Sequence, residues 1–180
     1  MRRKDREVSD LRQQLEIVRR CDSCCIAIND PDQDAPYIVE LSFGLEHLED
    51  KDILYVHSAK EGRKLELLAQ DPHVSFFMSC GHELVYDTER QMCTMNYESV
   101  SGYGIMRLLS AQEALHGLDV LMDHYYPHER RPYHKKAADS TAVYGLEILS
   151  YKTTKNNKNC RVVRKHPNQR PDTFDLRGNR

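Results

Sequence analysis

No run of apolar residues in this chain approaches the about 20 that a membrane-spanning helix needs, which excludes a helical membrane protein. No apolar segment follows the basic start at residues 1–7, and this start also carries acidic residues. A secretory signal needs an apolar core and a transit peptide avoids acids, so neither is indicated. We therefore expect a cytoplasmic protein that does not associate with a membrane.

A second pair of metal ligands beside the cysteines is also lacking. Six cysteines are present, and Cys21 and Cys24 form a C-x-x-C motif. A helix is expected before this motif and a strand after it, the reverse of the order around a thioredoxin-like redox pair. Zinc would need further ligands, and Cys80 with His82 does not supply a known zinc spacing. We interpret the cysteines as reduced thiols that fill space, with a metal site as the less favoured alternative.

Length and composition favour one globular domain followed by a tail. The chain has 180 residues, of which 39% are hydrophobic and 30% charged, enough to bury a core without disulfides. Residues 152–180 hold nine Lys or Arg against two Asp or Glu, so this segment carries +7 and the remainder −9. We expect a domain over residues 1–152 and a basic, disordered tail over residues 153–180. Nucleic-acid binding by the tail is disfavoured because aromatic residues are not interleaved with the basic ones.

Apolar periodicity predicts a mainly β chain with three helices at the seams. We expect helices over residues 10–20, 58–70 and 110–126. We expect strands over residues 24–28, 36–43, 53–57, 74–78, 83–86, 98–109 and 141–151. We expect polar connections over residues 44–52 and 128–139. This hairpin order is typical of a small closed or half-closed antiparallel barrel, and it disfavours an alternating α/β dinucleotide fold.

Two further motifs bear on the later elements. Ser110 and Glu113 form a capping box, in which each side chain satisfies a backbone N–H at the start of the third helix. Gly102 and Gly104 interrupt the long strand before it. This spacing indicates either a bend or a ligand that lies close against the backbone.

The stretch over residues 54–68 carries the strongest functional signal. It opens as a strand and becomes a helix, for which Ser58 and Glu61 form a second capping box. Arg63 and Lys64 follow in the first turns. A helix N-terminus offers N–H donors and positive potential, and arginine adds a planar fork, so this stretch predicts a phosphate site. The alternative is that both cations belong to an ordinary solvated helix face.

Four motifs in order resemble a known family over residues 1–152. They are Met1-Arg-Arg-Lys-Asp-Arg-Glu7, Pro36-Tyr-Ile-Val39, Leu54-Tyr-Val-His-Ser-Ala-Lys-Glu-Gly-Arg-Lys64 and Tyr97-Glu-Ser-Val-Ser-Gly-Tyr-Gly104. The chain resembles the nitroimidazole-resistance proteins of the pyridoxamine-phosphate-oxidase-like, FMN-binding split-barrel superfamily. The resemblance implies a six-stranded antiparallel split barrel with a Greek-key path, and a homodimer with an FMN at each end of its interface.

The resemblance also implies site residues. Arg63 and Lys64 would hold the phosphate, and His57 is associated with the active site. The implied cofactor-binding residues are Tyr37, Ile38, Val39, Glu40, Leu41, His57, Ser58, Arg63, Lys64 and Ser99. The strand over residues 37–42 would run along the flavin ring, and Ser99 would place a polar side chain near it.

Two departures from the family pattern narrow the function. Glu40 stands where the family usually has a proline. Its carboxylate would accept a hydrogen bond from the N3–H of the flavin ring, or it would repel the phosphate. The third alternative is that it faces solvent, because side chains alternate along a strand. Tryptophan is absent, and so is the Arg/His signature that binds pyridoxal in the C-terminal strand of the oxidases. Both absences weigh against pyridoxamine oxidation itself.

The leading hypothesis is an FMN-dependent reductase that acts on a small acceptor such as a nitro-aromatic compound. His57 would orient the substrate or donate a proton, since the pKa of histidine lies near neutrality. The bland alternative is a strand-end histidine with a satisfied hydrogen bond. The alternative functions are a non-catalytic flavin binder or sensor, and a haem-binding protein with ligands from His124, His128 and His134.

Overall fold

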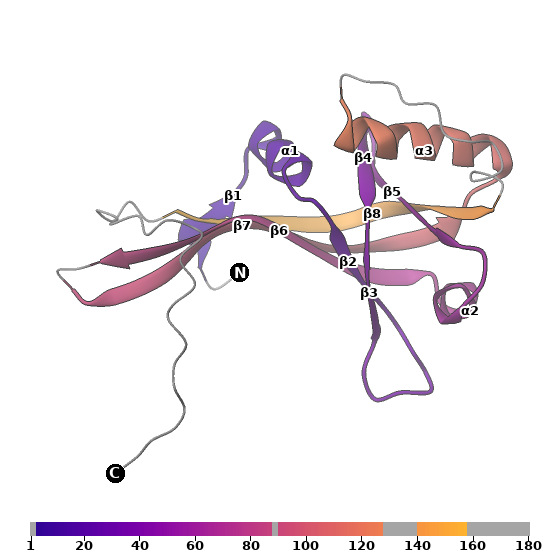
Figure 1. Cartoon of the computed structure of the whole chain (residues 1–180), viewed down its shortest axis with the longest axis horizontal. Coiled ribbons are helices and arrows are strands. Elements are labelled where there is room, and N and C mark those ends of the chain that lie inside the picture. The colour runs from indigo at the N-terminus through magenta and orange to yellow at the C-terminus, as the bar shows by residue number, and fades with distance from the viewer. Residues whose placement is uncertain (1–2, 88–89, 128–139, 158–180) are drawn as a thin grey trace, which may run out of the picture.

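One antiparallel sheet of eight strands organises the described part of the chain, and three α-helices pack against it (Figure 1). The computed structural model describes residues 3–87, 90–127 and 140–157. The helices are η1, a 3-10 turn (Lys4–Arg6), α1 (Leu11–Arg19), α2 (Arg63–Gln70) and α3 (Ala111–Tyr125). The strands are β1 (Glu7–Val8), β2 (Cys24–Ile28), β3 (Tyr37–Leu41), β4 (Phe43–His47), β5 (Asp52–Ala59), β6 (His73–Asp87), β7 (Met92–Leu108) and β8 (Thr141–Asn156). None of the helices in these ranges is long and apolar enough to cross a membrane.

The strand order closes the sheet into a split barrel. The main path runs β3-β2-β6-β7-β8-β5-β4, and the short β1 pairs with β8. β3 and β4 are therefore the two edges of the sheet, yet only Ser42 separates them in sequence. The two edges must meet at this residue, although no ladder joins them among the described residues. The expected fold class, a mainly β antiparallel split barrel with three α-helices, is confirmed, although the described sheet has eight strands and not the six expected.

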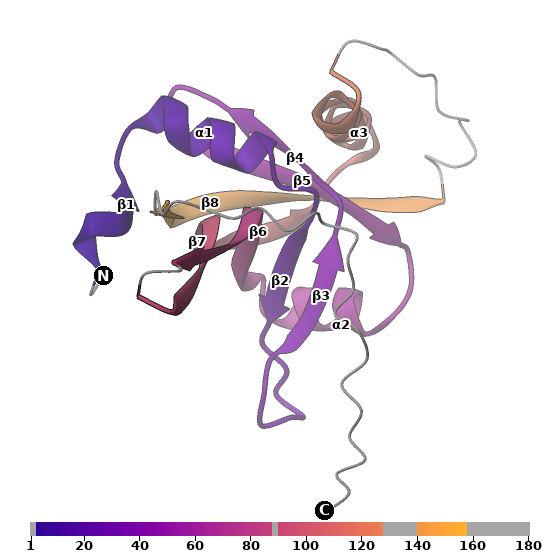
Figure 2. The same ribbon diagram turned by 60° about the vertical axis from the view of Figure 1, so that its left-hand side comes forward.

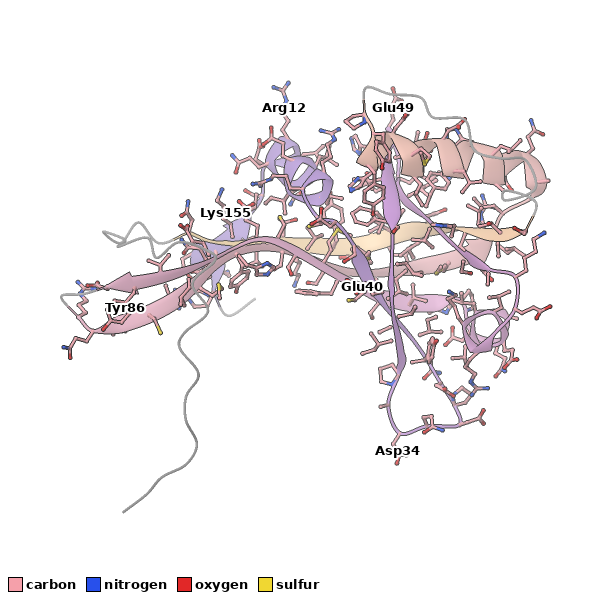
Figure 3. The ribbon with its side chains drawn as sticks, in the orientation of Figure 1. Arg12, Asp34, Glu40, Glu49, Tyr86 and Lys155 are labelled. Atoms are coloured by element: carbon pink, nitrogen blue, oxygen red, sulfur yellow. The ribbon has the colours of Figure 1, made fainter. Side chains whose placement is uncertain are left out.

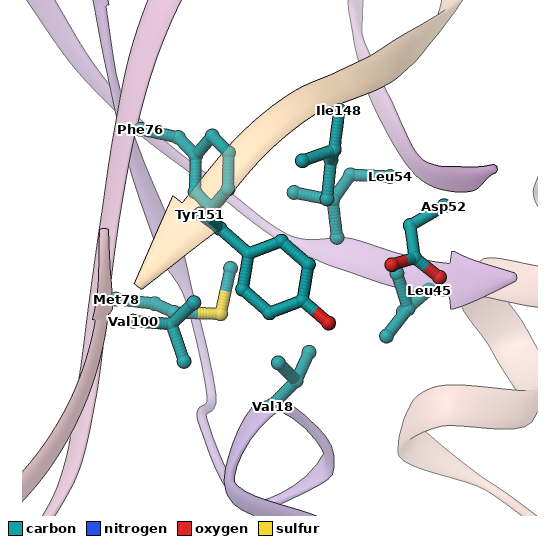
Figure 4. Close-up of a pocket in the computed structure, with 9 residues that line it drawn as sticks. All are labelled: Val18, Leu45, Asp52, Leu54, Phe76, Met78, Val100, Ile148 and Tyr151. Carbon is teal, nitrogen blue, oxygen red and sulfur yellow. The ribbon is translucent and has the colours of Figure 1, made fainter. Parts of the chain in front are cut away.

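Side chains fill the interior of the barrel. Ile26, Leu54 and Leu146 point inward from three strands and have no exposed surface, as expected for alternating strand positions. α1 covers this core with its buried residues Ile17 and Val18. A cavity of about 10 Å³ lies in this core, with room for about one water (Figure 4). This cavity is too small for a cofactor.

α3 builds a second, smaller core on the outside of the barrel, over β4, β5 and β8 (Figure 2). Its centre consists of Tyr55, Leu109 and Val143. A Cβ on Gly44 would lie 2.6 Å from the Cα of Leu121 in α3. The missing side chain at Gly44 therefore allows the helix to rest directly on β4.

The expected polar connection over residues 44–52 is wrong in its first half, which forms β4. Leu45 pairs with Leu54 of β5. The polar Glu46 accepts hydrogen bonds from the Tyr55 hydroxyl at 2.7 Å and from the His116 ring at 2.9 Å, so it is satisfied on a strand. Polarity concealed this strand because its hydrogen-bond partners lie far away in sequence.

Several predicted strands prove longer than expected. The strands predicted over residues 74–78 and 83–86 are one strand, β6, which continues through an irregularity between Cys80 and Glu83. β7 begins at Met92, and with β6 it forms a hairpin that extends beyond the barrel toward Tyr86 (Figure 3). β8 continues to Asn156, past the predicted end at residue 151, so the domain boundary expected after residue 152 falls inside a strand. The predicted loop over residues 128–139 lies outside the described residues.

The two predicted capping boxes have opposite outcomes. The Ser110–Glu113 box at the start of α3 is confirmed, with both reciprocal hydrogen bonds present. The Ser58–Glu61 box is wrong, because Ser58 belongs to β5 and its hydroxyl donates to the Ala59 carbonyl at 3.0 Å. The N-cap of α2 is Gly62, which offers no side-chain acceptor.

The confirmed box gives a simple stability test. Replacing Ser110 with alanine removes the acceptor for the Glu113 N–H and is expected to lower the free energy of unfolding by about 1 kcal/mol. Urea unfolding measures the loss. The matched control is Ser58→Ala, which removes a serine that caps no helix and should cost clearly less; equal losses would contradict the assigned role of Ser110.

Candidate functional site

Arg63, the first residue of α2, is held by carboxylates from the β2–β3 connection. Its guanidinium donates to Asp30 at 2.5 and 3.3 Å and to Asp32 at 2.5 Å, and Glu66 lies 3.6 Å away. Hydrogen bonding to Asp30 raises the pKa of Arg63, and the same contact lowers the pKa of Asp30. This clamp ties the turn after β2 to the start of α2, so the Arg63 fork is engaged by protein groups.

Lys64 is in a different situation from its neighbour. Its side chain is half-buried, and burial lowers the pKa of its ammonium group. Among the described residues, Lys64 has no hydrogen bond or ion pair. A half-buried cation without a counter-charge is costly, and an anion from outside the chain would relieve that cost.

His57 lies beside Lys64, near the end of β5. Its Nδ1 is buried and has no hydrogen-bond partner in the described structure. Burial lowers the pKa of His57, and the positive charge of Lys64 lowers it further. Both effects favour the neutral imidazole, which suits hydrogen bonding better than proton donation. Buried polar atoms normally have partners, so an orphaned one points to a missing ligand or water.

The start of α2 has no side-chain cap and has open space around Gly62. Gly62 has φ 119° and ψ 170°, a conformation that essentially only glycine adopts. A Cβ placed there would meet nothing within 4 Å. Because no side chain caps the helix, the first-turn N–H groups of Arg63 and Lys64 are free to donate to an anion.

β3 contributes a strip of alternating side chains close to β5. Val39 and Leu41 pack against the main core, whereas Ile38 and Glu40 face outward. Glu40 accepts a hydrogen bond from the Ser23 hydroxyl at 2.5 Å, so its carboxylate is engaged on the outer face. Phe43 pairs with Val56, which brings the end of β3 near His57.

Ser99 lies far from the other predicted site residues of the same chain. It pairs with Thr154 of β8, whereas His57 pairs with Val143 of the same strand. Eleven residues separate the two partners, which at about 3.3 Å per residue is roughly 35 Å of strand. The predicted residues thus form two groups. The first group contains His57, Ser58, Arg63, Lys64 and the β3 residues, and the second contains Ser99 alone.

The glycines of β7 serve packing. A Cβ on Gly102 would lie 2.7 Å from the Phe76 ring, and one on Gly104 would lie 2.1 Å from the Glu147 carbonyl oxygen. The register between β7 and β8 shifts between Tyr103 and Gly104. The bend that the sequence predicted is therefore present, and close protein neighbours account for both glycines.

No signal in the sequence identifies the two residues that anchor Arg63. Asp30 and Asp32 lie in the connection between β2 and β3, 33 and 31 residues before Arg63, and no local pattern links them to it. An open groove of about 450 Å³ lies elsewhere, lined by residues 47–52, 148–151 and Gln14, and includes none of the predicted site residues.

No cluster of three or more His, Cys, Asp or Glu in the described ranges is arranged to hold a metal ion. His124 donates from Nε2 to the Cys21 carbonyl at 3.0 Å, and its ring packs at a tilt of 47° against Phe43, with ring centroids 4.5 Å apart. His128 and His134 lie outside the described residues.

The pair of Lys64 and His57 gives a titration test. We expect His57 to titrate below the ordinary value of about 6.5. Lys64→Met should raise its pKa, but not to the ordinary value, because burial is the larger cause. NMR of the His57 Cε1–H signal measures both. Because the folded pKa lies below the unfolded one, the stability linked to His57 is complete above about pH 6.5 and declines as the pH falls.

The control for this titration is Lys60→Met, which removes a charge from an exposed neighbour. It should shift the pKa of His57 less than Lys64→Met does. Equal shifts would mean that the charge of Lys64 has no special influence on the imidazole.

The fold is an antiparallel split barrel, and the candidate site combines a basic helix start with a histidine near the end of a strand. A family model described as pyridoxamine 5'-phosphate oxidase matches residues 10–155. The chain therefore belongs to this family. A search of curated proteins found no match.

Solved structures support the fold assignment. A candidate 5-nitroimidazole antibiotic resistance protein from Bacteroides thetaiotaomicron is 29% identical, with a TM-score of 0.70 over 82% of this chain and 84% of that one. An FAD- and heme-binding protein from Mycobacterium smegmatis is 15% identical, with a TM-score of 0.70 over 85% of this chain and 74% of that one. A flavocytochrome from Azotobacter vinelandii is 18% identical, with a TM-score of 0.67 over 96% of this chain and 90% of that one. At these identities, the likeness to the last two proteins shows the fold alone.

Proposed function

We propose that this protein binds FMN and reduces a small acceptor such as a nitro-aromatic compound. The observation that carries the proposal is the pair of unpartnered polar groups at the start of α2, the Lys64 ammonium and the His57 Nδ1. The Mycobacterium smegmatis relative is described as FAD-binding, which supports a flavin as the ligand, and the likeness to the Bacteroides protein supports a nitro-aromatic acceptor. A phosphate group would supply the anion that Lys64 lacks.

Lys64 would be the main phosphate ligand of the site. Its charge is free, and the uncapped N–H groups of the first turn of α2 point in the same direction as the positive end of the helix dipole. Arg63 would mainly hold the start of α2 in position, because Asp30 and Asp32 bind its guanidinium. Ser58 lies at the end of β5 next to this turn and could offer its hydroxyl.

The flavin ring would lie along β3, beside His57. Bound flavin supplies the electron-transfer chemistry, and the protein contributes binding, orientation and exclusion of water. His57 would orient the acceptor, with a proton held on one ring nitrogen and the other nitrogen free to accept. Glu40 is engaged by Ser23, which favours the solvent-facing alternative for this carboxylate.

A second copy of the chain would complete the site. The outer face of the sheet exposes Ile38 on β3, Phe77 on β6 and Tyr103 on β7. Apolar side chains gathered on one face favour a protein partner. Ser99 is too distant to reach the flavin site of its own chain, so in a homodimer it would serve the site of the partner.

The visible spectrum of the purified protein tests the proposal. We expect flavin absorbance, loss of this absorbance on reduction by NADH or NADPH, and its return when a nitroimidazole is added without oxygen. Protein that neither carries FMN nor binds added FMN would overturn the proposal. Bound FMN without turnover of any acceptor would favour the alternative, a non-catalytic flavin binder. A Soret band after haem addition would favour haem binding.

A further inference from the structure

We propose that Cys21 and Cys80 form a reversible disulfide, a modification site that joins the end of α1 to β6. This inference does not depend on flavin binding, because neither residue belongs to the proposed cofactor site. Both residues carry free thiols in the described structure.

The two thiols meet at one backbone carbonyl. The Sγ of Cys21 donates to the Ile17 carbonyl oxygen at 3.3 Å, and the Sγ of Cys80 donates to the same oxygen at 3.7 Å. Cys21 follows α1 directly, and its N–H donates to the Val18 carbonyl at 3.1 Å. Two thiols that share one acceptor lie side by side, although they are far apart in sequence.

Interaction between the two thiols supports the same geometry. Burial is the first cause that raises the pKa of Cys21, and Cys80 is the second, through both charge and hydrogen bonding. Cys24 is the rival partner because it completes the C-x-x-C motif. Its thiol instead donates to the Cys25 carbonyl at 3.8 Å, and burial raises its pKa to about 12. Cys80 is therefore the better placed partner.

The two thiols differ in access, which sets the order of the reaction. Cys21 is 1% exposed, whereas Cys80 is only half-buried. The Sγ of Cys80 lies 4.0 Å from Oε2 of Glu98, which forms ion pairs with Arg20 and Lys155. Arg20 and Lys155 offset the negative charge of this carboxylate, so access decides which of the two thiols reacts first. Cys80 should thus react first with a small acidic disulfide such as glutathione disulfide.

The chemistry is a double thiol–disulfide exchange. The Cys80 thiolate attacks one sulfur of glutathione disulfide, forms a mixed disulfide and releases one glutathione thiolate. The Cys21 thiolate then attacks the Cys80 sulfur and releases the second glutathione. Two protein thiols are oxidised, one glutathione disulfide is reduced, and the two thiol protons end on the two released glutathione molecules. Excess dithiol reverses the reaction.

The experiment uses the full-length chain with Cys25, Cys93 and Cys160 replaced by serine, treated with glutathione disulfide and analysed by intact mass spectrometry. We expect the loss of two hydrogen atoms per chain without a stable glutathione adduct. The cross-link closes a loop of about 60 residues, so Tm should rise by roughly 5 °C or more and return after reduction.

Single variants separate the possible outcomes. In the same background, Cys21→Ser should trap one glutathione on Cys80, and Cys24→Ser should leave the cross-link intact. A cross-link that persists in Cys80→Ser and disappears in Cys24→Ser would overturn the proposal in favour of the C-x-x-C pair. Persistent free thiols at positions 21 and 80 would also overturn it. If a serine variant fails to fold, peptide mapping of the oxidised parent chain for a link between positions 21 and 80 decides the question.

Discussion

Lys64→Met is expected to raise the Kd for FMN by about 10- to 100-fold, because a charge-assisted hydrogen bond contributes about 1.5–3 kcal/mol. Lys64 is the half-buried cation beside His57 that has no carboxylate partner among the described residues. Methionine preserves the length and apolar body of the side chain and removes the charge. Fluorescence titration of the apoprotein with FMN measures the change.

Two further variants sharpen this test. Lys60→Met removes a positive charge from an exposed position four residues away and should change the Kd little. Arg63→Met should lower stability, because it leaves Asp30 without its bidentate partner, and should weaken FMN binding less than Lys64→Met. If Arg63→Met abolished binding while Lys64→Met did not, the phosphate would belong to Arg63.

Gly44→Ala is expected to lower the free energy of unfolding by about 2–3 kcal/mol, which is the upper part of the range for overpacking. The added Cβ would lie 2.6 Å from both the Cα of Leu121 and the carbonyl oxygen of Val120. These are backbone atoms, so the clash cannot be relieved by a side-chain rotation and α3 must move away from β4. Urea unfolding followed by far-UV circular dichroism measures the loss.

Gly145→Ala is the matched control, because this glycine also lies in a strand beneath the second core. Its nearest contact would be the Cδ2 of Leu109 at 3.3 Å, the end of a side chain that can shift. The cost should be clearly smaller than at Gly44. Equal costs would show that α3 does not rest as tightly on β4 as the contacts at Gly44 indicate.

Local sequence patterns predicted the parts of the fold that depend on near neighbours. The strand Cys24–Ile28 follows from a short apolar run, and the Ser110 capping box follows from two residues three positions apart. β4 was missed because Glu46 is satisfied by Tyr55 and His116, partners that only the folded chain supplies. Propensity cannot recognise a polar strand whose hydrogen bonds are tertiary.

The candidate site shows the same limit. The sequence located α2 and both cations, but it began the helix five residues too early and did not show that Arg63 and Lys64 have different partners. Asp30 and Asp32 cause that difference, and they reach Arg63 only through the barrel topology. The orphaned Nδ1 of His57 is likewise a property of packing. The Ser58 capping box failed because β5 continues through Ser58 and leaves Gly62 at the cap.

The link at Ser42 has a consequence for how the barrel moves. Covalent continuity, and not a ladder, holds β3 beside β4, while β2 pairs with β3 on its other side. Separating β3 from β4 breaks no inter-strand hydrogen bonds. The free energy of opening the barrel should therefore be lower here than between any two strands that share a ladder. A planar ligand bound along β3 would stabilise the closed arrangement of β3 and β4, and amide hydrogen exchange in β3 should slow when it binds.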